Sequence, residues 1–171
     1  RLKLERIDLY QLHAVDPKVP IEDSISALAE LREEGKIRHA AVCNVTVEEL
    51  DRARQIVEIV SVQNRYNIAD RASEDVLEVC ERDGLAFLPW FPLATGDLAR
   101  TGGPLDSVAR KHSASPAQVA LAWLLHHSPV MLPIAGTSSI AHFDENLAAS
   151  ELPLDEEDLA ALEDAAAAAS S

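Results

Sequence analysis

The segment IRHAAVCNVTVEEL, residues 37–50, contains one complete strand-to-helix unit. Its first part, 37–44, is a short apolar run that includes β-branched side chains, which is typical of a strand buried on both faces. Thr46 and Glu49 then have the spacing of a capping box, in which two side chains satisfy backbone N–H groups at a helix start. The segment therefore predicts a strand that is followed directly by a helix.

The same alternation continues along the whole chain. We predict strands at 7–13, 37–44, 60–63, 85–91 and 130–135. Between and after them, apolar spacing near 3.6 residues and recognisable end signals predict helices at 20–35, 46–57, 73–84, from 115 onward, at 139–150 and from 155 into the alanine-rich tail. Strands that alternate with helices indicate a parallel sheet with the helices outside it. The predicted fold class is therefore α/β, built of parallel βα repeats.

The spacing of these repeats leaves two architectures. The predicted strands start about 31 residues apart, which is also the length of one unit in a (β/α)8 barrel of roughly 250 residues. The 171 residues have room for five such units and not for eight. The chain is thus either a complete five-stranded open sheet or five of the eight units of a barrel.

The strand ends favour the partial barrel. Polar or aromatic residues end every predicted strand: His13, Cys43, Asn44, Gln63, Asn64, Trp90, Phe91, Gly136 and Thr137. An open doubly wound sheet usually gathers its ligands at one Gly-rich turn, but the chain contains neither G-x-G-x-x-G nor G-x-x-x-x-G-K-[ST]. A ring of functional groups is typical of a barrel mouth.

The net charge and the apolar stretches of the chain limit the kinds of partner that it can bind. The chain carries 15 Lys and Arg against 29 Asp and Glu, a net charge of −14. Such a surface repels phosphate backbones and anionic lipids, so we expect neither nucleic acid nor a membrane as a partner. The longest apolar stretch, 119–125, is far shorter than the ~20 residues of a membrane helix.

The cellular compartment can be predicted from the two cysteines and from the first residues of the chain. Cys43 and Cys80 make no disulfide framework and have no metal-ligand spacing, so we expect no metal and a cytoplasmic protein. The chain starts without methionine and without an apolar leader, from which we expect a piece of a longer protein.

Six segments together resemble one enzyme family. They are 7–13 (IDLYQLH), 34–38 (EGKIR), 43–45 (CNV), 60–67 (VSVQNRYN), 89–94 (PWFPLA), and 133–139 (PIAGTSS) with the pair Glu145-Asn146. In order and spacing they are similar to strands four to eight of the aldo-keto reductases. The resemblance implies a single domain, 1–171, that forms the C-terminal part of a TIM-type (β/α)8 barrel with its C-terminal helix.

The family transfers hydride from a nicotinamide dinucleotide, usually NADPH, to an aldehyde or ketone. A tyrosine protonates the carbonyl oxygen, an aspartate and a lysine tune that tyrosine, and a histidine orients the carbonyl. By resemblance His13 is that histidine, and neutral imidazole can donate one N–H to a carbonyl oxygen. The family's Asp, Tyr and Lys come from its second and third strands, which the resemblance does not cover. We therefore expect this chain to be an inactive fragment when alone.

The two tyrosines do not replace the missing acid. Side chains alternate along a strand, so Tyr10 faces the helices while Leu9, Gln11 and His13 share the other face. Tyr66 lies in a loop and could line a pocket, but without a cation beside it an ordinary tyrosine is a poor proton donor at neutral pH.

The resemblance also implies the cofactor contacts. Asn44 and Gln63 would hydrogen-bond the nicotinamide carboxamide, Cys43 stands where the family has serine, and Trp90 would stack on the nicotinamide ring. Trp123, in contrast, lies in a helix that is apolar almost all round and is interpreted as core. Residues 93–96 would pass under the pyrophosphate with their backbone N–H groups as donors, and Phe91, Pro92, Leu93 and Ala94 are predicted cofactor contacts.

The last group of predicted contacts precedes and opens a helix, where unpaired N–H groups favour anions. It consists of Gly136, Thr137, Ser138, Ser139, His142, Glu145 and Asn146. The first five would surround the adenosine 2′-phosphate or ribose, and the last two the adenine. The family often has Lys and Arg where Gly136 and His142 stand, which weakens the case for NADP over NAD without overturning it.

Two alternatives stay open. The chain could belong to a non-catalytic aldo-keto-reductase-like module that binds nicotinamide cofactor or regulates a partner. It could also be a self-sufficient five-stranded open domain of unrelated function. Substrate, reaction direction and oligomeric state cannot be predicted from the sequence.

The first predicted strand leads to a test of the fragment interpretation. Residues 7–13 form a long, weakly charged strand that would expose an unpaired edge. We therefore expect the isolated chain to associate through this edge, aggregate or fold poorly, as measured by light scattering on a size-exclusion column. A monodisperse monomer that melts cooperatively would contradict the fragment interpretation.

Overall fold

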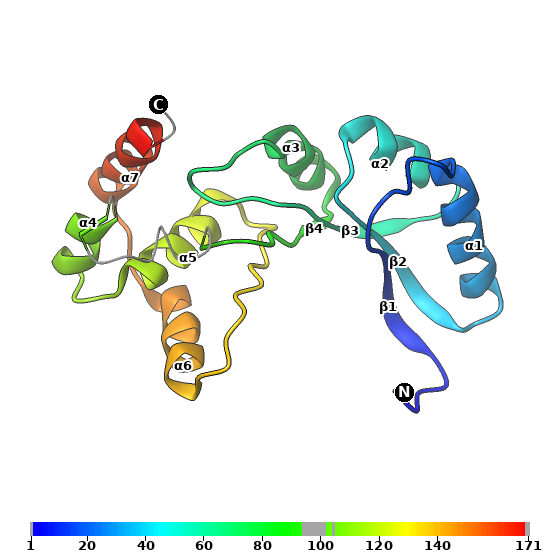
Figure 1. Cartoon of the computed structure of the whole chain (residues 1–171), viewed down its shortest axis with the longest axis horizontal. Coiled ribbons are helices and arrows are strands. Elements are labelled where there is room, and N and C mark those ends of the chain that lie inside the picture. Colours follow the sequence, from blue (N-terminus) through cyan, green and yellow to red (C-terminus); the bar gives the residue numbers. More distant parts are fainter. Residues whose placement is uncertain (1, 94–101, 104, 170–171) are drawn as a thin grey trace. The chain divides into compact units, whose positions relative to one another are not determined.

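The computed structural model describes residues 2–93, 102–103 and 105–169 of the chain (Figure 1). The chain divides into two compact units. Unit 1 comprises Arg1–Asn64 and Ser73–Leu88, and unit 2 comprises Arg65–Ala72 and Pro89–Ser171.

Unit 1 is a parallel sheet with three helices. Its strands are β1 (Ile7–Leu12), β2 (Ile37–Cys43), β3 (Ile59–Gln63) and β4 (Ala86–Phe87). They pair in chain order, each parallel to the next. The helices that follow the first three strands are α1 (Ile21–Glu33), α2 (Val47–Arg54) and α3 (Glu74–Asp83). The predicted α/β class with parallel βα repeats is confirmed.

Local signals placed these helices correctly. The Thr46 side chain accepts the backbone N–H of Glu49, and the Glu49 carboxylate accepts the N–H of Thr46, so the capping box at the start of α2 is present. Helix α3 ends at Asp83, and the next residue, its C-cap Gly84, is in the left-handed region with φ 69°. A residue without Cβ adopts that conformation with little strain, so the chain turns there toward β4.

The two faces of the sheet differ in chemistry. The strand register places Ala40, Val42, Val62 and Phe87 on one face, and all four are completely buried. This is the face that α1, α2 and α3 cover, and it forms the core of unit 1. Residues on the opposite face include Gln11, His39 and Ser61, which are polar.

Strand β1 lies at the edge of the sheet (Figure 1). Within the described residues it pairs only with β2. Leu9 and Tyr10 point to opposite faces, yet they are 41% and 43% exposed. The strand is therefore uncovered at one edge and partly uncovered on both faces.

Two strand predictions need correction. The strand expected at 85–91 is reduced to Ala86–Phe87, because Pro89 and Pro92 have no N–H group to donate to a neighbouring strand. The strand expected at 130–135 was wrong. In the described part of the chain, that segment contains an isolated bridge residue, Met131, and a backbone hydrogen bond of 3.3 Å from Ile134 N–H to the Pro89 carbonyl, but no strand. Pro133 within it also lacks a donor, which limits its pairing.

Unit 2 is mostly helical. It contains α4 (Asp106–Lys111), α5 (Pro116–His127), α6 (Ile140–Ala148), the short 3-10 helix η2 (Ala149–Glu151) and α7 (Glu156–Ala169). The predicted start of α5 is confirmed, since Ser115 and Gln118 form a capping box and Pro116 is the first helical residue. Helix α4 was not predicted. None of the helices in the described residues is long and apolar enough to cross a bilayer.

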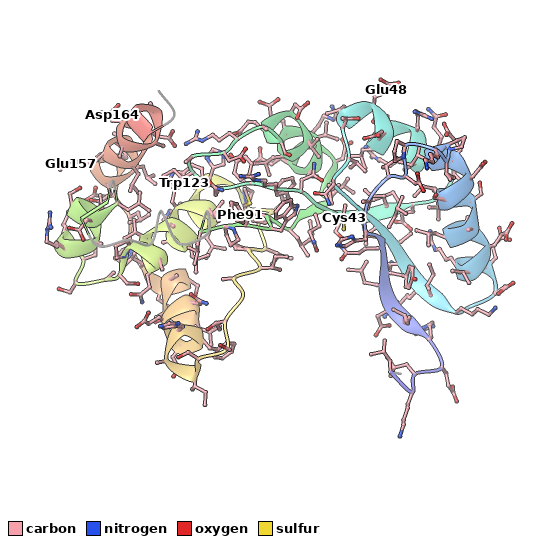
Figure 2. All side chains as sticks on the ribbon, viewed as in Figure 1. Cys43, Glu48, Phe91, Trp123, Glu157 and Asp164 are labelled. Atoms are coloured by element: carbon pink, nitrogen blue, oxygen red, sulfur yellow. The ribbon has the colours of Figure 1, made fainter. Side chains whose placement is uncertain are left out.

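The centre of unit 2 is a stack of rings. Trp123 of α5 (Figure 2) is 1% exposed and stacks on His127 at 4.5 Å and on Tyr66 at 6.4 Å between ring centroids. The Tyr66 hydroxyl lies 2.9 Å from His127 Nε2, and Trp123 Nε1 donates to Glu163 at 3.1 Å. Trp123 is thus a core residue, as predicted, and Tyr66 belongs to the same core.

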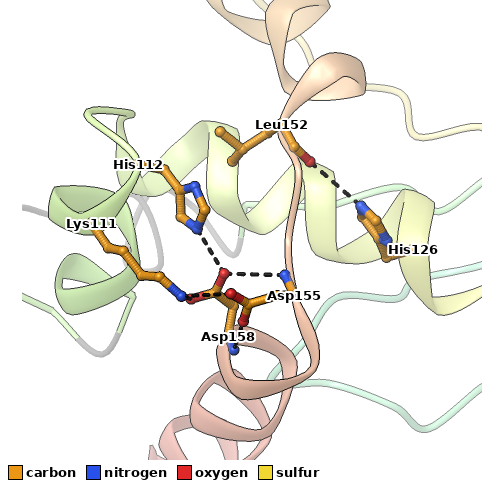
Figure 3. Close-up of polar contacts among 6 residues, drawn as sticks. All are labelled: Lys111, His112, His126, Leu152, Asp155 and Asp158. Carbon is orange, nitrogen blue, oxygen red and sulfur yellow. Dashed lines mark hydrogen bonds and ion pairs between the residues drawn. The ribbon is translucent and has the colours of Figure 1, made fainter.

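A buried carboxylate joins α7 to α4 (Figure 3). Asp158 is 2% exposed, and it accepts from Lys111 Nζ at 2.7 Å and lies 2.7 Å from His112 Nε2. Lys111 also donates to Asp155 at 2.9 Å, and the backbone N–H of Asp155 donates to Asp158. Burial alone would raise the pKa of Asp158, but the hydrogen bonds from Lys111 and His112 outweigh it and hold that pKa well below its usual value.

This cluster makes the stability of unit 2 depend on pH. Because the folded-state pKa of Asp158 lies below the unfolded value of about 3.9, its contribution is present above about pH 4 and is lost as the pH falls below it. We expect Asp158→Asn to lower the free energy of unfolding by about 3 kcal/mol at pH 7, since it leaves Lys111 and His112 facing a neutral group.

Urea unfolding of the full gene product at pH 7 and pH 3 measures this effect. The difference between wild type and Asp158→Asn should shrink at pH 3. Asp164→Asn, on the exposed side of the same helix (Figure 2), is the matched control and should change little at either pH. A loss of equal size at both pH values would contradict the assignment.

Candidate functional site

In unit 1, three strand ends are joined through Asn44. This residue directly follows β2 and has a left-handed backbone with φ 55°, which asparagine tolerates better than most residues. Its side-chain Nδ2 donates to the carbonyl oxygen of His13 at 3.2 Å, and its backbone N–H donates to the carbonyl oxygen of Gln63 at 3.0 Å. His13, Asn44 and Gln63, predicted from the sequence as site residues, are therefore neighbours at the carboxyl end of the sheet.

A second asparagine holds the loop that carries Asn44. Asn64 is 4% exposed, and its side chain pairs with both backbone groups of Val45: Oδ1 accepts the N–H at 3.1 Å, and Nδ2 donates to the carbonyl at 2.8 Å. Nδ2 also lies 3.3 Å from the Ser73 hydroxyl at the start of α3. Asn64 thereby fixes the end of β2 relative to the end of β3, a positioning role that the sequence analysis did not predict.

The face of the sheet that carries Gln11, His39 and Ser61 also carries the predicted site residues Cys43 and Gln63 at its carboxyl end. Three side-chain atoms on it are buried without a hydrogen-bond partner among the described residues: Gln11 Nε2, His39 Nδ1 and Ser61 Oγ. The strand register places these residues on the same face as Cys43 and Gln63. Buried polar atoms are normally satisfied, so this face has the character of a surface that meets polar groups or water.

Both cysteines are neutral thiols. Cys43 is 1% exposed, and burial raises its pKa. For Cys80, burial in α3 raises the pKa to about 12. Cys43 therefore adds a weak thiol donor to the strand ends and no negative charge.

In unit 2, the chain after β4 carries two aromatic residues under an arginine. The ring centroids of Trp90 and Phe91 are 5.9 Å apart, with 63° between the ring planes in an edge-to-face arrangement, and the Arg65 guanidinium lies 4.6 Å from the Phe91 centroid. Phe91 (Figure 2) has a left-handed φ of 66°, and its carbonyl accepts from the buried Asn67 side chain at 3.1 Å. A bulky residue in this region is strained, and such strain is frequent at functional sites.

A separate pocket of about 310 Å³ in unit 2 brings together most of the other predicted residues. It is lined by Leu93, Ser115, Ala117, Gly136, Thr137, His142, Glu145 and Asn146. Six of these eight were predicted from the sequence. Ser115 and Ala117, at the start of α5, were not, because only the tertiary fold brings them to the segment before α6.

The remaining predicted residues have other positions. Pro92 is buried, and Ser138 and Ser139 do not line the pocket. Ser139 instead caps α6, since its hydroxyl accepts the backbone N–H of His142 at 3.4 Å. Ala94 lies outside the described residues.

The donors around this pocket suit a polar ligand that carries phosphate. It adjoins the starts of α5 and α6, where backbone N–H groups and the helix dipole favour anions. A Cβ placed on Gly136 would meet no atom within 4 Å, so there is open space beside the backbone. In the part of the chain that the structure describes, no group of His, Cys, Asp and Glu side chains is arranged to hold a metal ion.

These features define a partial (β/α)8 barrel with polar strand ends. The aldo/keto reductase family model matches residues 1–167. Consistent with this, an uncharacterized oxidoreductase of Schizosaccharomyces pombe is 48% identical over 96% of this chain and 54% of its own length. Pyridoxine 4-dehydrogenase of Escherichia coli is 47% identical over 84% of this chain and 50% of its own length. The chain belongs to the aldo/keto reductase family.

Solved structures agree with this assignment. A thermostable aldo-keto reductase in complex with the inhibitor epalrestat superimposes with a TM-score of 0.86 and 34% identity, over 94% of this chain and 60% of its own. An aldo-keto reductase from Klebsiella pneumoniae in complex with NADP and acetate gives 0.83 and 29%, over 94% of this chain and 59% of its own. The chain spans about half the length of the curated relatives it matches.

The role of Asn64 can be tested by mutation. We expect Asn64→Ala to destabilise the full gene product by about 2 kcal/mol or more, because the backbone N–H and carbonyl of Val45 lose their partners in a buried place. Urea unfolding measures this change. Gln55→Ala, at an exposed position after α2, is the control and should stay within about 0.5 kcal/mol of wild type. Similar effects of the two substitutions would contradict the positioning role.

Proposed function

We propose that this chain carries the cofactor site and the carbonyl-orienting histidine of an oxidoreductase that reduces small aldehydes or ketones to alcohols with NADPH. The observation that carries the proposal is the pocket of unit 2, in which six residues predicted as cofactor contacts line one space. Two structural neighbours from Klebsiella pneumoniae were crystallised with NADP or NADPH, which supports NADP as the cofactor, with NAD as an alternative.

The pocket residues fit the adenosine end of such a cofactor. Thr137, His142 and Gly136 would surround the 2′-phosphate or ribose, together with Ser138 and Ser139, whose segment opens α6. Glu145 and Asn146, one turn further along α6, would contact the adenine. Leu93 leads from the aromatic pair Trp90-Phe91 to this pocket within unit 2, which suits a dinucleotide that extends from a ring on Trp90 toward α6.

The strand ends of unit 1 fit the carboxamide and the substrate. His13 would donate a hydrogen bond from a ring N–H to the carbonyl oxygen of the substrate. Neutral imidazole can make this hydrogen bond because one of its two ring nitrogens carries a proton. Gln63 and Asn44 would pair with the nicotinamide carboxamide, and the hydrogen bond from Asn44 to the His13 carbonyl keeps these residues adjacent. A bound dihydronicotinamide would supply the hydride, and the family's tyrosine, which matches no position in this sequence, would supply the proton that completes the alcohol.

Of the family's four catalytic groups, this sequence would supply the histidine alone. The family's proton-donating tyrosine and its aspartate and lysine match no position here. Tyr66 is completely buried against Trp123 and His127, and Tyr10 lies on the opposite face of the sheet from Gln11. We therefore infer that residues 1–171 alone are inactive and that the three groups come from residues outside this sequence.

Uncovered apolar surface supports a larger barrel. Strand β1 has an open edge in the described residues, and α6 has no buried residue: Ile140, Phe143 and Leu147 are 81%, 53% and 57% exposed. Surfaces of this kind are normally covered. We propose that residues 1–171 are a single domain that forms the C-terminal part of an aldo-keto reductase barrel, corresponding to its strands four to eight and its C-terminal helix.

A non-catalytic cofactor-binding or regulatory module is the second candidate. The position of the two tyrosines favours it, because neither supplies an acid beside His13. The proposal places the protein in the cytoplasm, supported by the two free thiols, with a small carbonyl compound and not nucleic acid or membrane as its partner. Carbonyl-dependent oxidation of NADPH by the full gene product separates the two candidates.

The stacking role of Trp90 gives a direct test. We expect NADPH to quench the tryptophan fluorescence of the full gene product, and Trp90→Leu to weaken NADPH binding about tenfold by removing a flat ring face. The 171-residue chain alone should bind more weakly or not at all.

Trp123→Phe is the matched control, because Trp123 is a core residue of the same unit. It should keep both the quenching and the affinity. If Trp90→Leu binds NADPH as tightly as wild type, the ring is not stacked on Trp90. If the wild-type product binds neither NADPH nor NADH, the proposed function is wrong.

A further inference from the structure

The Lys and Arg side chains that the structure describes in unit 2 form ion pairs and do not line the pocket. The described residues of this unit contain four Lys and Arg side chains, and each forms an ion pair with a carboxylate. The pairs are Arg65–Asp70, Arg71–Glu163, Arg110–Asp106, and Lys111 with Asp155 and Asp158. None of the four lines the pocket of Leu93, Gly136 and His142. The described lining therefore carries no permanent positive charge.

Two ionisable side chains do line the pocket, and both come from α6. His142 lies in the first turn of the helix and Glu145 one turn later. The other described residues of the lining are uncharged: Ser115 and Ala117 at the start of α5, Gly136 and Thr137 from the segment before α6, Leu93 from the chain after β4, and Asn146 of α6. Asp144 of α6 is a further exposed acid next to them. The formal charge of the described lining is thus zero when the His142 imidazole is protonated and −1 when it is neutral.

We propose that His142 makes the choice between NADPH and NADH depend on pH. With a protonated imidazole His142 attracts the adenosine 2′-phosphate, and with a neutral imidazole it offers no charge that distinguishes the 2′-phosphate of NADPH from the 2′-hydroxyl of NADH. This inference rests on the proposed function. Its basis is that imidazole changes charge between pH 5 and 8, whereas an arginine would stay charged throughout.

The direction of the effect follows from linkage. A 2′-phosphate beside His142 favours the protonated ring, so NADPH binding takes up protons and strengthens as the pH falls. NADH offers no such charge and its affinity should stay flat. Because a phosphate monoester begins to gain its own proton near pH 6, the comparison belongs between pH 6.5 and 8.5.

The experiment is calorimetric titration of the full gene product with NADPH and with NADH at pH 6.5 and 8.5. We expect the ratio of Kd for NADH to Kd for NADPH to be about fivefold larger at pH 6.5, the size of one partly exposed ion pair. Repeating the NADPH titration in two buffers of different ionisation enthalpy measures the proton uptake, which should be present for NADPH and absent for NADH.

Variants separate His142 from other sources of pH dependence. His142→Gln should remove the change of the ratio and the proton uptake, while His142→Arg should give a high ratio at both pH values. His126→Gln is the matched control, because His126 is an exposed histidine on α5 outside the pocket, and it should behave as wild type. Circular dichroism checks that each variant is folded.

The outcomes distinguish this inference from the proposed function. If both cofactors bind but the ratio does not change with pH, or if His142→Gln keeps the change, the role of His142 is overturned while the proposed function stands. If neither cofactor binds, the proposed function fails and this inference fails with it.

Discussion

The parallel register of β1, β2 and β3 is the constraint on which the rest of unit 1 depends. Side chains alternate between the two faces of a strand, so a slip of one residue would exchange the faces completely. Val42 and Val62 would leave the helix-covered core, and Ser61 and Gln11 would enter it without partners. The register therefore fixes which residues reach the carboxyl end of the sheet together. Asn44 and Asn64 then bind that end with hydrogen bonds to backbone groups of His13, Gln63 and Val45.

Local sequence signals predicted the helices better than the strands. The capping boxes at Thr46 and Ser115 and the glycine after α3 act within a few residues, so the sequence contains the whole interaction. A strand needs a partner that the local sequence does not specify. The segment 130–135 has β-branched and apolar residues like the other strands, but Pro133 and the prolines on the neighbouring segment limit pairing, and only one backbone hydrogen bond to Pro89 forms.

The candidate site could be predicted only as far as the resemblance reached. It named six residues of the unit 2 pocket, and Asn44 together with the two residues to which it is hydrogen-bonded, His13 and Gln63. The resemblance includes Asn64 in the segment 60–67 but gives it no role, and Ser115 lies outside the matching segments. The physical reason is that each acts on a backbone group or space that is distant along the chain or set by the fold. The hydroxyl of Ser115 predicted a helix cap, and nothing in its local sequence indicates that the same helix start borders a pocket.

Charge distribution connects the fold of unit 2 with its pocket. The chain has about twice as many carboxylates as Lys and Arg side chains, so most cations have a carboxylate nearby. In the described part of unit 2, all four Lys and Arg side chains form ion pairs with carboxylates. One of these pairs, Lys111 with the buried Asp158, joins α4 to α7 and cannot move toward a ligand without leaving a carboxylate buried and uncompensated. The ion pairs that stabilise the unit are thus unavailable for binding phosphate. Among the described residues, the groups at this pocket that can attract an anion are the backbone N–H groups at the starts of α5 and α6 and the imidazole of His142.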